Sequence, residues 1–426
     1  MGPSEKSERY RWTILITVYQ SMLAFTLLFQ SLPPILPLIV LKLHLTYAQS
    51  GLSMSLFALP GIFVSLLGGF LSDRYGMRPL GTSCFLLMIA GTLLVGLGRD
   101  IHILLSGRII AGIGAFTLSI LLPKLISQWF KDRELGLAMG IFNTAVPLGS
   151  VICFGLFGKM GSLWGWRVPI LLTGAYSLIA SIFFLRYYQV PSSQKMEKDK
   201  PLGFHSNSRL VGMNVFRHRS EDVTPHGSLG RLLGAMGLHK SLQEIGFPIW
   251  GVGLSWLWFN AGMVSFSTFA PDLFLQKGYT IEQSGLLIGI PPLGSLFLST
   301  PTGYLIDRFR HHGWLIGIGG VGLSLLTFCF NFSSSYLMIV VLMGVFSGII
   351  PSPIYSFVPA ILRPKNMGLG FGIISTCSCI GIFLGPYLVG KTKDLTGSNH
   401  WGFILISFFF LLTTAFILLT HHVRKP

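Results

Sequence analysis

The stretch that decides the fold is "GGFLSDRYGMRP", residues 68–79, which stands where a long apolar run ends. Two glycines close the run, and one acid and two bases, Asp73, Arg74 and Arg78, follow within a few residues. A second version, "TGYLIDRFRHHG", appears 234 residues later at 302–313. A charged turn that twice ends a hydrophobic segment indicates an internal repeat.

The composition indicates a membrane protein. Of the 426 residues, 51% are hydrophobic and 11% are charged, and the mean hydropathy is +0.66. A soluble domain of this length would carry about 25% charged residues. Apolar runs long enough to cross a bilayer as helices recur along the whole chain. We therefore expect an all-α polytopic membrane protein.

The apolar runs predict twelve transmembrane helices, arranged as two pseudo-symmetric six-helix bundles. The bundles are residues 1–188 and 248–426, and the polar stretch 189–247 between them is expected to be a cytoplasmic linker, because its charges cluster and it has no apolar period. The twelve segments are 12–41, 48–71, 79–98, 103–127, 135–158, 167–188, 248–275, 283–305, 313–331, 336–361, 367–389 and 401–420.

The lysines and arginines predict the orientation in the membrane. If the N-terminus is cytoplasmic, the cytoplasmic segments hold 23 of the 31 basic residues. Basic residues accumulate on the cytoplasmic side of membrane proteins, so both termini and the linker are expected there, in a plasma (inner) membrane. Anionic lipids facing the basic loops account for the net charge of +16, and no nucleic-acid partner is expected.

A shift of 234 residues aligns the two halves. "QSGL" at 49–52 falls on "QSGL" at 283–286, and the two charged turns coincide. The matched positions of the turns are Gly69 with Gly303, Leu71 with Leu305, Asp73 with Asp307 and Arg74 with Arg308. Six helices, a linker and six helices of the same orientation make a parallel repeat, whose halves can rock about a site at the middle of the membrane.

The first turn closely resembles the loop between helices 2 and 3 of the major facilitator superfamily, with the pattern G-x-L-x-D-R-x-G-x-R. The positions that fill it are Gly69, Leu71, Asp73, Arg74, Gly76 and Arg78. Arg108-x-x-x-Gly112-x-Gly114 resembles the family's helix 4 motif, and the stretch 122–150 is loosely similar to porters for organic anions, cyanate and nitrate. The resemblance covers the whole chain and implies the major facilitator fold.

The resemblance implies that the turn docks on the start of helix 11 from the other half. Asp73 would face the amides near 366–369, and Gly69 would let the helices approach closely. By pseudo-symmetry Asp307 would face the start of helix 5 near 135–136. The expected gating residues are Gly69, Asp73, Arg74, Gly76, Arg78, Asp307 and Arg308. The alternative for the arginines is that they only follow the positive-inside rule.

All fifteen acidic residues and all eleven histidines fall at the ends of predicted spans or in loops. We therefore expect no carboxylate-based proton relay at the centre of the cavity. Asp272, at the outer end of the seventh helix, is the nearest candidate. The spans also hold no nucleophile with its base and no metal cluster, so we expect neither an enzyme nor a cofactor.

Arg108 is the one basic residue well inside a predicted span, and no acid within a span can pair with it. Two alternatives follow. Its guanidinium either bonds backbone carbonyls and serves the structure, or it supplies the sole charge of the cavity and binds an anionic solute through its planar fork.

Polar and aromatic side chains on the helices that line the cavity in this family complete the expected solute site. These substrate-binding candidates are Gln20, Asn143, Trp256, Asn260 and Tyr355, together with Arg108. Their alternative role is to bond neighbouring helices. Prolines at 33, 34, 37, 351 and 353 predict that the first and tenth helices bend.

The sequence thus predicts a monomeric secondary active or facilitative transporter of a small solute, with lipids as its other partners. An organic or inorganic anion is favoured. The alternatives are a neutral solute, drug efflux on the same fold, or a membrane receptor on a transporter scaffold.

Overall fold

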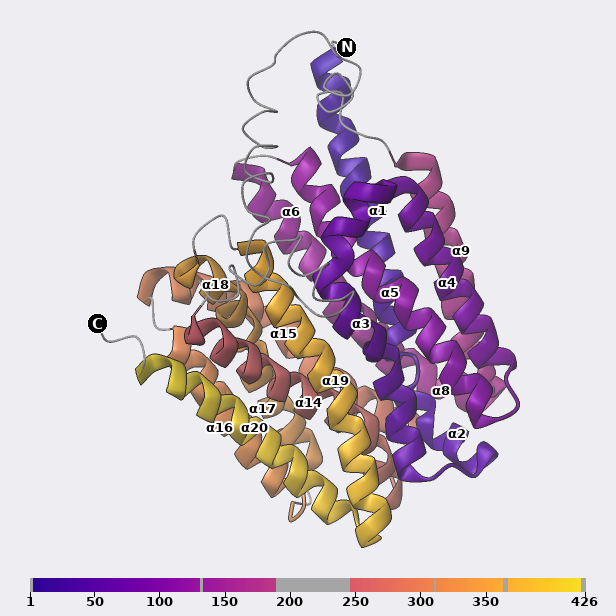
Figure 1. Cartoon of the computed structure of the whole chain (residues 1–426). Coiled ribbons are helices and arrows are strands. Elements are labelled where there is room, and N and C mark those ends of the chain that lie inside the picture. Colours follow the sequence, from indigo (N-terminus) through magenta and orange to yellow (C-terminus); the bar gives the residue numbers. More distant parts are fainter. Residues whose placement is uncertain are drawn as a thin grey trace, which may run out of the picture. The chain divides into compact units, whose positions relative to one another are not determined.

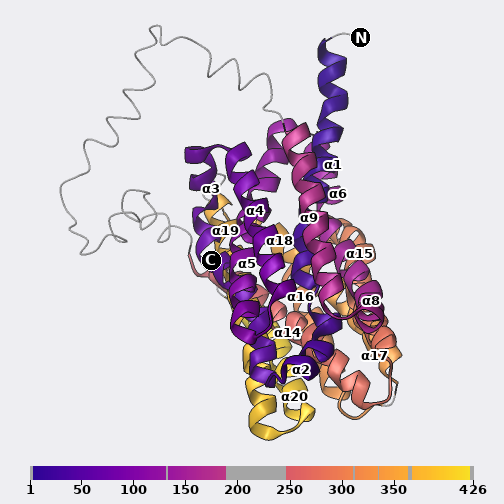
Figure 2. The ribbon, with the colours of Figure 1, turned by 90° about the vertical axis from the view of Figure 1, so that its right-hand side faces the viewer.

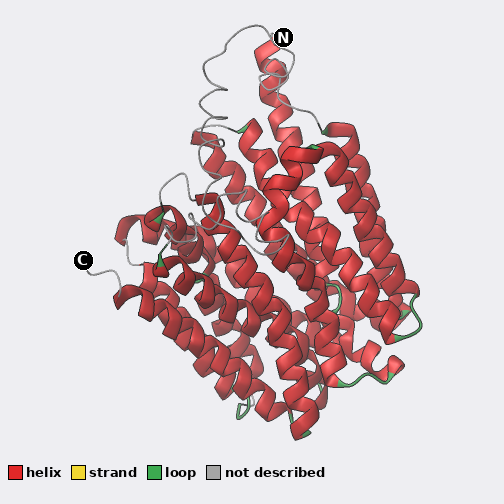
Figure 3. Cartoon of the chain, viewed as in Figure 1, coloured by secondary structure: helices red, strands yellow, loops and turns green. Residues whose placement is uncertain are grey.

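The computed structural model describes residues 3–130, 133–188, 246–309, 312–333, 335–362 and 367–422, and every regular element among them is a helix (Figures 1 and 3). The expected all-α class is therefore confirmed. The predicted linker 189–247 lies almost entirely outside the described residues.

The N-terminal half supplies six membrane-length segments. The first is α1 (Pro3–Gln30), η1 (Pro33–Ile35) and α2 (Leu36–Leu43) in succession, followed by α3 (Tyr47–Tyr75), α4 (Met77–Leu97) and α5 (Ile101–Trp129). The fifth is α6 (Arg133–Asn143), α7 (Ala145–Ile152), η2 (Cys153–Phe157) and α8 (Gly158–Trp164), and the sixth is α9 (Arg167–Tyr187).

The C-terminal half repeats this order. Its elements are α14 (Phe247–Gln276), α15 (Ile281–Phe309), α16 (His312–Cys329), α17 (Tyr336–Gly348) with α18 (Pro351–Ile361), α19 (Met367–Thr396) and α20 (Asn399–His422). Among the described residues, ten segments are long and apolar enough to cross a membrane, and Gly313–Cys329 is a shorter apolar helix. The remaining segment, α14, has 30 residues and would be about 45 Å long. Each of the twelve predicted spans thus has a counterpart.

Prolines interrupt the first and tenth segments, as predicted. The first breaks between Gln30 and Leu36, where η1 begins with Pro33 and Pro34. The tenth breaks between Gly348 and Pro351. Proline lacks the amide that the helix ladder needs, so the chain changes direction at these points.

The fifth segment differs from the single helix predicted at 135–158. It is interrupted at Thr144 and again by η2, a turn of π-helix over Cys153–Phe157. At η2 the backbone carbonyl of Phe154 lies so close to α15 that a side chain at Gly285 would come within 2.3 Å of it. Pro147 alone did not indicate a break of this kind.

Two seams join the halves. Along the first, α3 packs against α19, and the two helices run side by side in the centre of Figure 1. Along the second, α15 packs against α7, η2 and α8, and the labels of α15 and α8 lie close together in Figure 2. One end of the bundle holds α2, α8 and the end of α19, and both seams reach it. The basic residues predict that this end faces outside. We call it the outer end.

Helix α19 is longer than predicted. It continues to Thr396 rather than stopping at 389, so that Lys393 and Asp394 lie in its last turns and not in a loop. Gly397, with a φ of +65°, then ends it in a conformation that favours glycine. This correction places two charged residues at the outer end of the α3–α19 seam.

Candidate functional site

Arg108 lies inside the N-terminal half with 2% of its surface exposed. Its Nε donates to the carbonyl of Ser53 at 3.0 Å, and its two terminal nitrogens donate to Leu28 at 3.1 Å and Phe29 at 3.4 Å. The guanidinium carbon also stands 4.3 Å from the centre of the Phe57 ring. This geometry matches the first of the two alternatives, in which Arg108 bonds backbone carbonyls.

The break in the first segment explains why one of those carbonyls, that of Phe29, accepts a hydrogen bond from Arg108. The carbonyl of Phe29 would normally bond the amide four residues on, but that residue is Pro33 and has no N–H. Arg108 supplies the missing donor. It thereby ties the bend of the first segment to α3 and α5, and its role as an anion ligand stays a prediction.

The other candidates of the N-terminal half do not gather around Arg108. The hydroxyl of Tyr176 on α9 donates to Oε1 of Gln20. Asn143 is exposed at the end of α6, and the neighbouring Thr144 bonds the hydroxyl of Tyr19 at 3.2 Å. Gln20 therefore takes the helix-bonding role in this structure, while Asn143 remains accessible.

The candidates of the C-terminal half form a cluster. The ring of Trp256 lies 5.6 Å from that of Tyr355, edge to face, and 5.0 Å from that of Phe259, stacked. Asn260, one turn further along α14, donates to the carbonyl of Trp256 at 2.7 Å. The structure thus brings together three predicted residues from α14 and α18.

Two features of this cluster are suited to binding a solute. Trp256 is buried, and its indole Nε1 has no acceptor among the described residues. Tyr355 keeps 48% of its surface exposed. A buried donor and a half-exposed tyrosine side chain can both contact a polar ligand.

The cytoplasmic gating candidates are described only in part. Gly76 separates α3 from α4 with a φ of +81°, which requires glycine, and Arg78 donates to the carbonyl of Leu185 on α9 at 3.1 Å. The side chains of the others lie outside the described residues, so the predicted contacts of Gly69, Asp73, Arg74, Asp307 and Arg308 stay predictions.

The outer end of the α3–α19 seam holds a charged junction that the sequence did not predict. The two oxygens of the Asp394 carboxylate accept hydrogen bonds from the amides of Tyr47, at 2.9 Å, and Ala48, at 2.7 Å. These are the first two residues of α3, whose amides have no partner within their own helix. A side chain of one half therefore caps a helix of the other.

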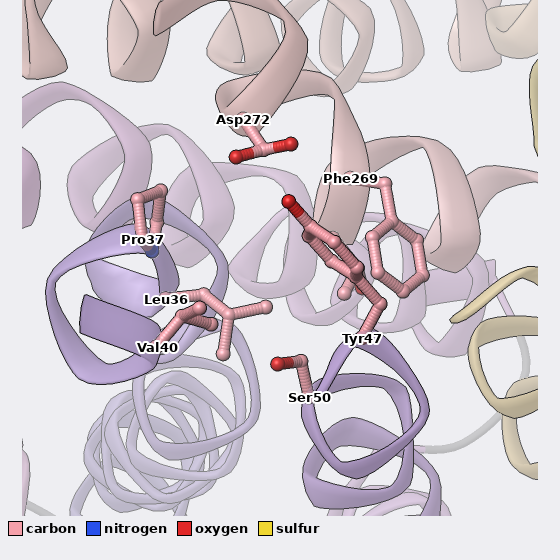
Figure 4. Close-up of a pocket in the computed structure, with 8 residues that line it drawn as sticks. Leu36, Pro37, Val40, Tyr47, Ser50, Phe269 and Asp272 are labelled. Carbon is pink, nitrogen blue, oxygen red and sulfur yellow. The ribbon is translucent and has the colours of Figure 1, made fainter. Parts of the chain in front are cut away.

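Lys393 completes the junction. It is 4% exposed, pairs with the carboxylate of Asp272 on α14, and holds its ammonium 3.5 Å from the centre of the Tyr47 ring. Asp272, Tyr47 and Ser50 also line a pocket between α2, α3 and α14, in which the carboxylate and the phenol face each other (Figure 4). We call Tyr47, Asp272, Lys393 and Asp394 the outer junction.

Comparisons with known proteins agree with this architecture. The family model described as Major Facilitator Superfamily matches residues 18–280 and 252–426. A probable sulfoacetate transporter of Cupriavidus necator is 23% identical over 389 residues, 87% of this chain and 84% of that protein. A D-galactonate transporter of Escherichia coli is 23% identical over 359 residues, 81% of this chain and 80% of that protein.

Among solved structures, the chain is similar to a bacterial homologue of the human lysosomal transporter Spinster in an inward-facing, unoccupied conformation. The TM-score is 0.75 and the identity is 17%, over 97% of each chain. This similarity concerns the fold.

Proposed function

The chain belongs to the Major Facilitator Superfamily, and from this premise we propose that it is a secondary transporter that moves a small organic anion across the membrane by alternating access. The outer junction is the observation that carries the proposal. It joins the two halves through a helix cap and through the contact of the Lys393 ammonium with the Tyr47 ring. Such contacts can be released while each half keeps its own core, as rocking of the halves requires.

An anionic solute is supported by the charges of the described helices. Two cations, Arg108 and Lys393, are buried there, and Lys393 is paired with Asp272. Arg108 has only carbonyl, ring and sulfur partners, so its charge is not neutralised by an acid among the described residues. An uncompensated buried cation raises the potential around it and favours anions even without direct contact. The transporters of sulfoacetate and D-galactonate to which the chain is similar are named for organic anions.

Purified protein in liposomes tests this function. Uptake of labelled carboxylates, sulfonates and sugar acids would be compared with uptake of a neutral sugar and a cationic dye, at several solute concentrations and with empty liposomes as the background. We expect saturable uptake of at least one anion and exchange against the same anion inside. Saturable transport of the sugar or the dye alone would contradict the anion proposal, and anion binding without transport would favour a receptor.

We place the solute contacts of the C-terminal half at Trp256, Asn260 and Tyr355. Tyr355→Phe removes one hydroxyl and should raise KM about two- to tenfold with kcat little changed, since one hydrogen bond contributes about 0.5–1.5 kcal/mol. Tyr336→Phe is the matched control, because Tyr336 is 4% exposed and packs on Phe274 and Phe330. Equal KM values for both variants would remove Tyr355 from the site.

A further inference from the structure

Asp394 occupies a position that is unfavourable for its own helix. It lies two residues before the end of α19, where the helix dipole places partial negative charge. A carboxylate at a helix C-terminus is destabilising unless a partner outside the helix offsets the repulsion. The partner of Asp394 is the N-terminus of α3, which carries partial positive charge and free amides.

The cap on α3 has two parts of different origin. Thr46 and Gln49 form a capping box within α3: the amide of Gln49 donates to the Thr46 hydroxyl at 3.2 Å, and the amide of Thr46 donates to Gln49 at 3.0 Å. The amides of Tyr47 and Ala48 lie between these two and are bound by Asp394. The part of the cap supplied by α19 is lost when the helix ends separate, and the part supplied by α3 is kept.

The same offset occurs at the other end of the seam. Asp73 lies two residues before the end of α3 at Tyr75, as Asp394 lies two residues before the end of α19 at Thr396. Each acid is followed three positions later by a glycine with positive φ, Gly76 at +81° and Gly397 at +65°. The two helices run antiparallel, since Gly51 lies against Pro386 and Ser65 against Ser375, so the C-terminal end of each points toward the N-terminal end of the other.

We propose that Asp394 is a gating residue that locks the outer ends of the halves, as the reciprocal of the cap predicted for Asp73 at the cytoplasmic ends. With the outer side closed, Asp394 caps α3; with the cytoplasmic side closed, Asp73 caps α19. This inference rests on the proposed function, because a lock of this kind serves alternating access.

The contacts of Lys393 and Tyr47 indicate that the lock is released in a single step, because its contacts across the halves are broken together. Tyr47 belongs to the N-terminal half, and both its amide and its ring contact α19, through Asp394 and Lys393 respectively. Asp272 belongs to the same half as Lys393, so this ion pair can persist when the halves separate. Opening therefore breaks the cap and the contact with the ring together and leaves no lysine without its acid.

A distance measurement that needs no solute tests the lock. Spin labels at Leu97 and Trp401, both exposed at the outer ends of α4 and α20, would report the separation of the halves in liposomes. The exposed Cys329 is replaced by Ser beforehand. The ratio of long to short distances is the population with widely separated labels divided by the population with close labels. For Asp394→Ala we expect this ratio to rise at least about threefold, as loss of a helix cap implies. Asp394→Asn keeps one acceptor oxygen and should give an intermediate shift.

Asp100→Ala is the matched control. Asp100 also caps a helix at the outer end, but it accepts from Ile103 of its own half, at 3.0 Å. Its loss should leave the distances unchanged. The lock is overturned if Asp394→Ala matches the parent protein, or if Asp100→Ala produces the same shift. If Asp394→Ala shifts the distances but the parent protein transports none of the tested solutes, the lock is upheld and the proposed transport is refuted. If the parent protein transports a solute but Asp394→Ala does not shift the distances, the transport is upheld and the lock is refuted.

Discussion

The N-termini of α3 and α15 are equivalent positions of the repeat, and each helix begins with the same capping box. In α3 the box is Thr46 with Gln49, at 3.0 and 3.2 Å; in α15 it is Thr280 with Gln283, at 2.9 and 3.2 Å. The two boxes are 234 residues apart, which is the offset of the repeat. The local sequence is therefore the same at the two helix starts in the residues that form the cap.

The neighbouring half treats them differently. Helix α3 receives the carboxylate of Asp394, and a buried lysine stands against its first ring. At the start of α15, Lys159 of the other half holds its ammonium 4.0 Å from Glu282, with 58% and 46% of the two side chains exposed. An exposed pair at this distance contributes little. Pseudo-symmetry thus specifies the helices, and the polar contacts concentrate on one seam.

The largest expected effect is on the stability of the N-terminal half, which contributes a helix to each seam. If Arg108 ties the bend of the first segment to α3 and α5, then Arg108→Leu removes three hydrogen bonds to backbone carbonyls. The carbonyl of Leu28 keeps the hydroxyl of Ser31, whereas that of Phe29, four residues before Pro33, loses its donor. One buried acceptor left unsatisfied costs about 1–3 kcal/mol, so we expect a loss of that size, measured by thermal unfolding in detergent. Arg99→Gln, at an exposed position, is the control.

The same experiment separates the two roles of Arg108. Structural anchoring predicts lower stability and only a small rise in KM, from the lost long-range charge, in the protein that remains folded. Direct anion binding predicts a strongly raised KM with normal stability, and that outcome would return Arg108 to the solute site.

The second prediction compares one glycine on each seam, Gly51 of α3 and Gly158 of α8. A Cβ at Gly51 would lie 2.1 Å from the carbonyl of Pro386, whereas one at Gly158 would lie 3.0 Å from that of Ile281. Backbone cannot yield as a flexible side chain does, so Gly51→Ala should force the α3–α19 seam apart. We expect a larger rise in long outer distances for Gly51→Ala than for Gly158→Ala. Equal shifts would show that the closer backbone contact at Gly51 does not control the separation of the outer ends.

The sequence predicted the helices well because their signals are local. Apolar runs, prolines and the repeat placed twelve spans and the bends of the first and tenth segments. The π-turn at Cys153–Phe157 was missed, because it depends on packing against α15 rather than on residue type. The same limit explains Arg108, whose free carbonyl partner arises from a proline on another helix.

The outer junction was missed for a different reason. Ending the eleventh helix at 389 placed Lys393 and Asp394 in a loop, where charges need no explanation. A signal was present: "DLTG" at 394–397 repeats the acid and glycine spacing of "DRYG" at 73–76. Reading that spacing as the end of a helix would have extended α19. The cluster of Trp256, Asn260 and Tyr355 was predicted as candidates, but its mutual contacts required the fold.

The third prediction pairs the two ends of the locked seam. Asp73→Ala should favour the conformation that is closed outside, so that long outer distances become rarer, opposite in sign to Asp394→Ala. The double variant should return the ratio of long to short distances to within about twofold of the parent, since distant independent effects add. A double variant that behaves like either single variant would show that the two acids do not act on one equilibrium.

The smallest expected effect is at the other seam. Lys159→Met removes the partner of Glu282 but leaves the capping box of Thr280 and Gln283 intact. An exposed ion pair contributes about 0–1 kcal/mol and is weakened by salt. We therefore expect the ratio of long to short outer distances to stay within about twofold of the parent, at low and at high ionic strength. Lys159 lies in α8, the last element of the fifth segment, and Lys393 lies in the last turns of α19, the corresponding segment of the other half. Lys159 is therefore the position best suited to test the asymmetry between the seams. A shift as large as that of Asp394→Ala would mean that both seams are locked and that the capping carboxylate confers no special role on α3.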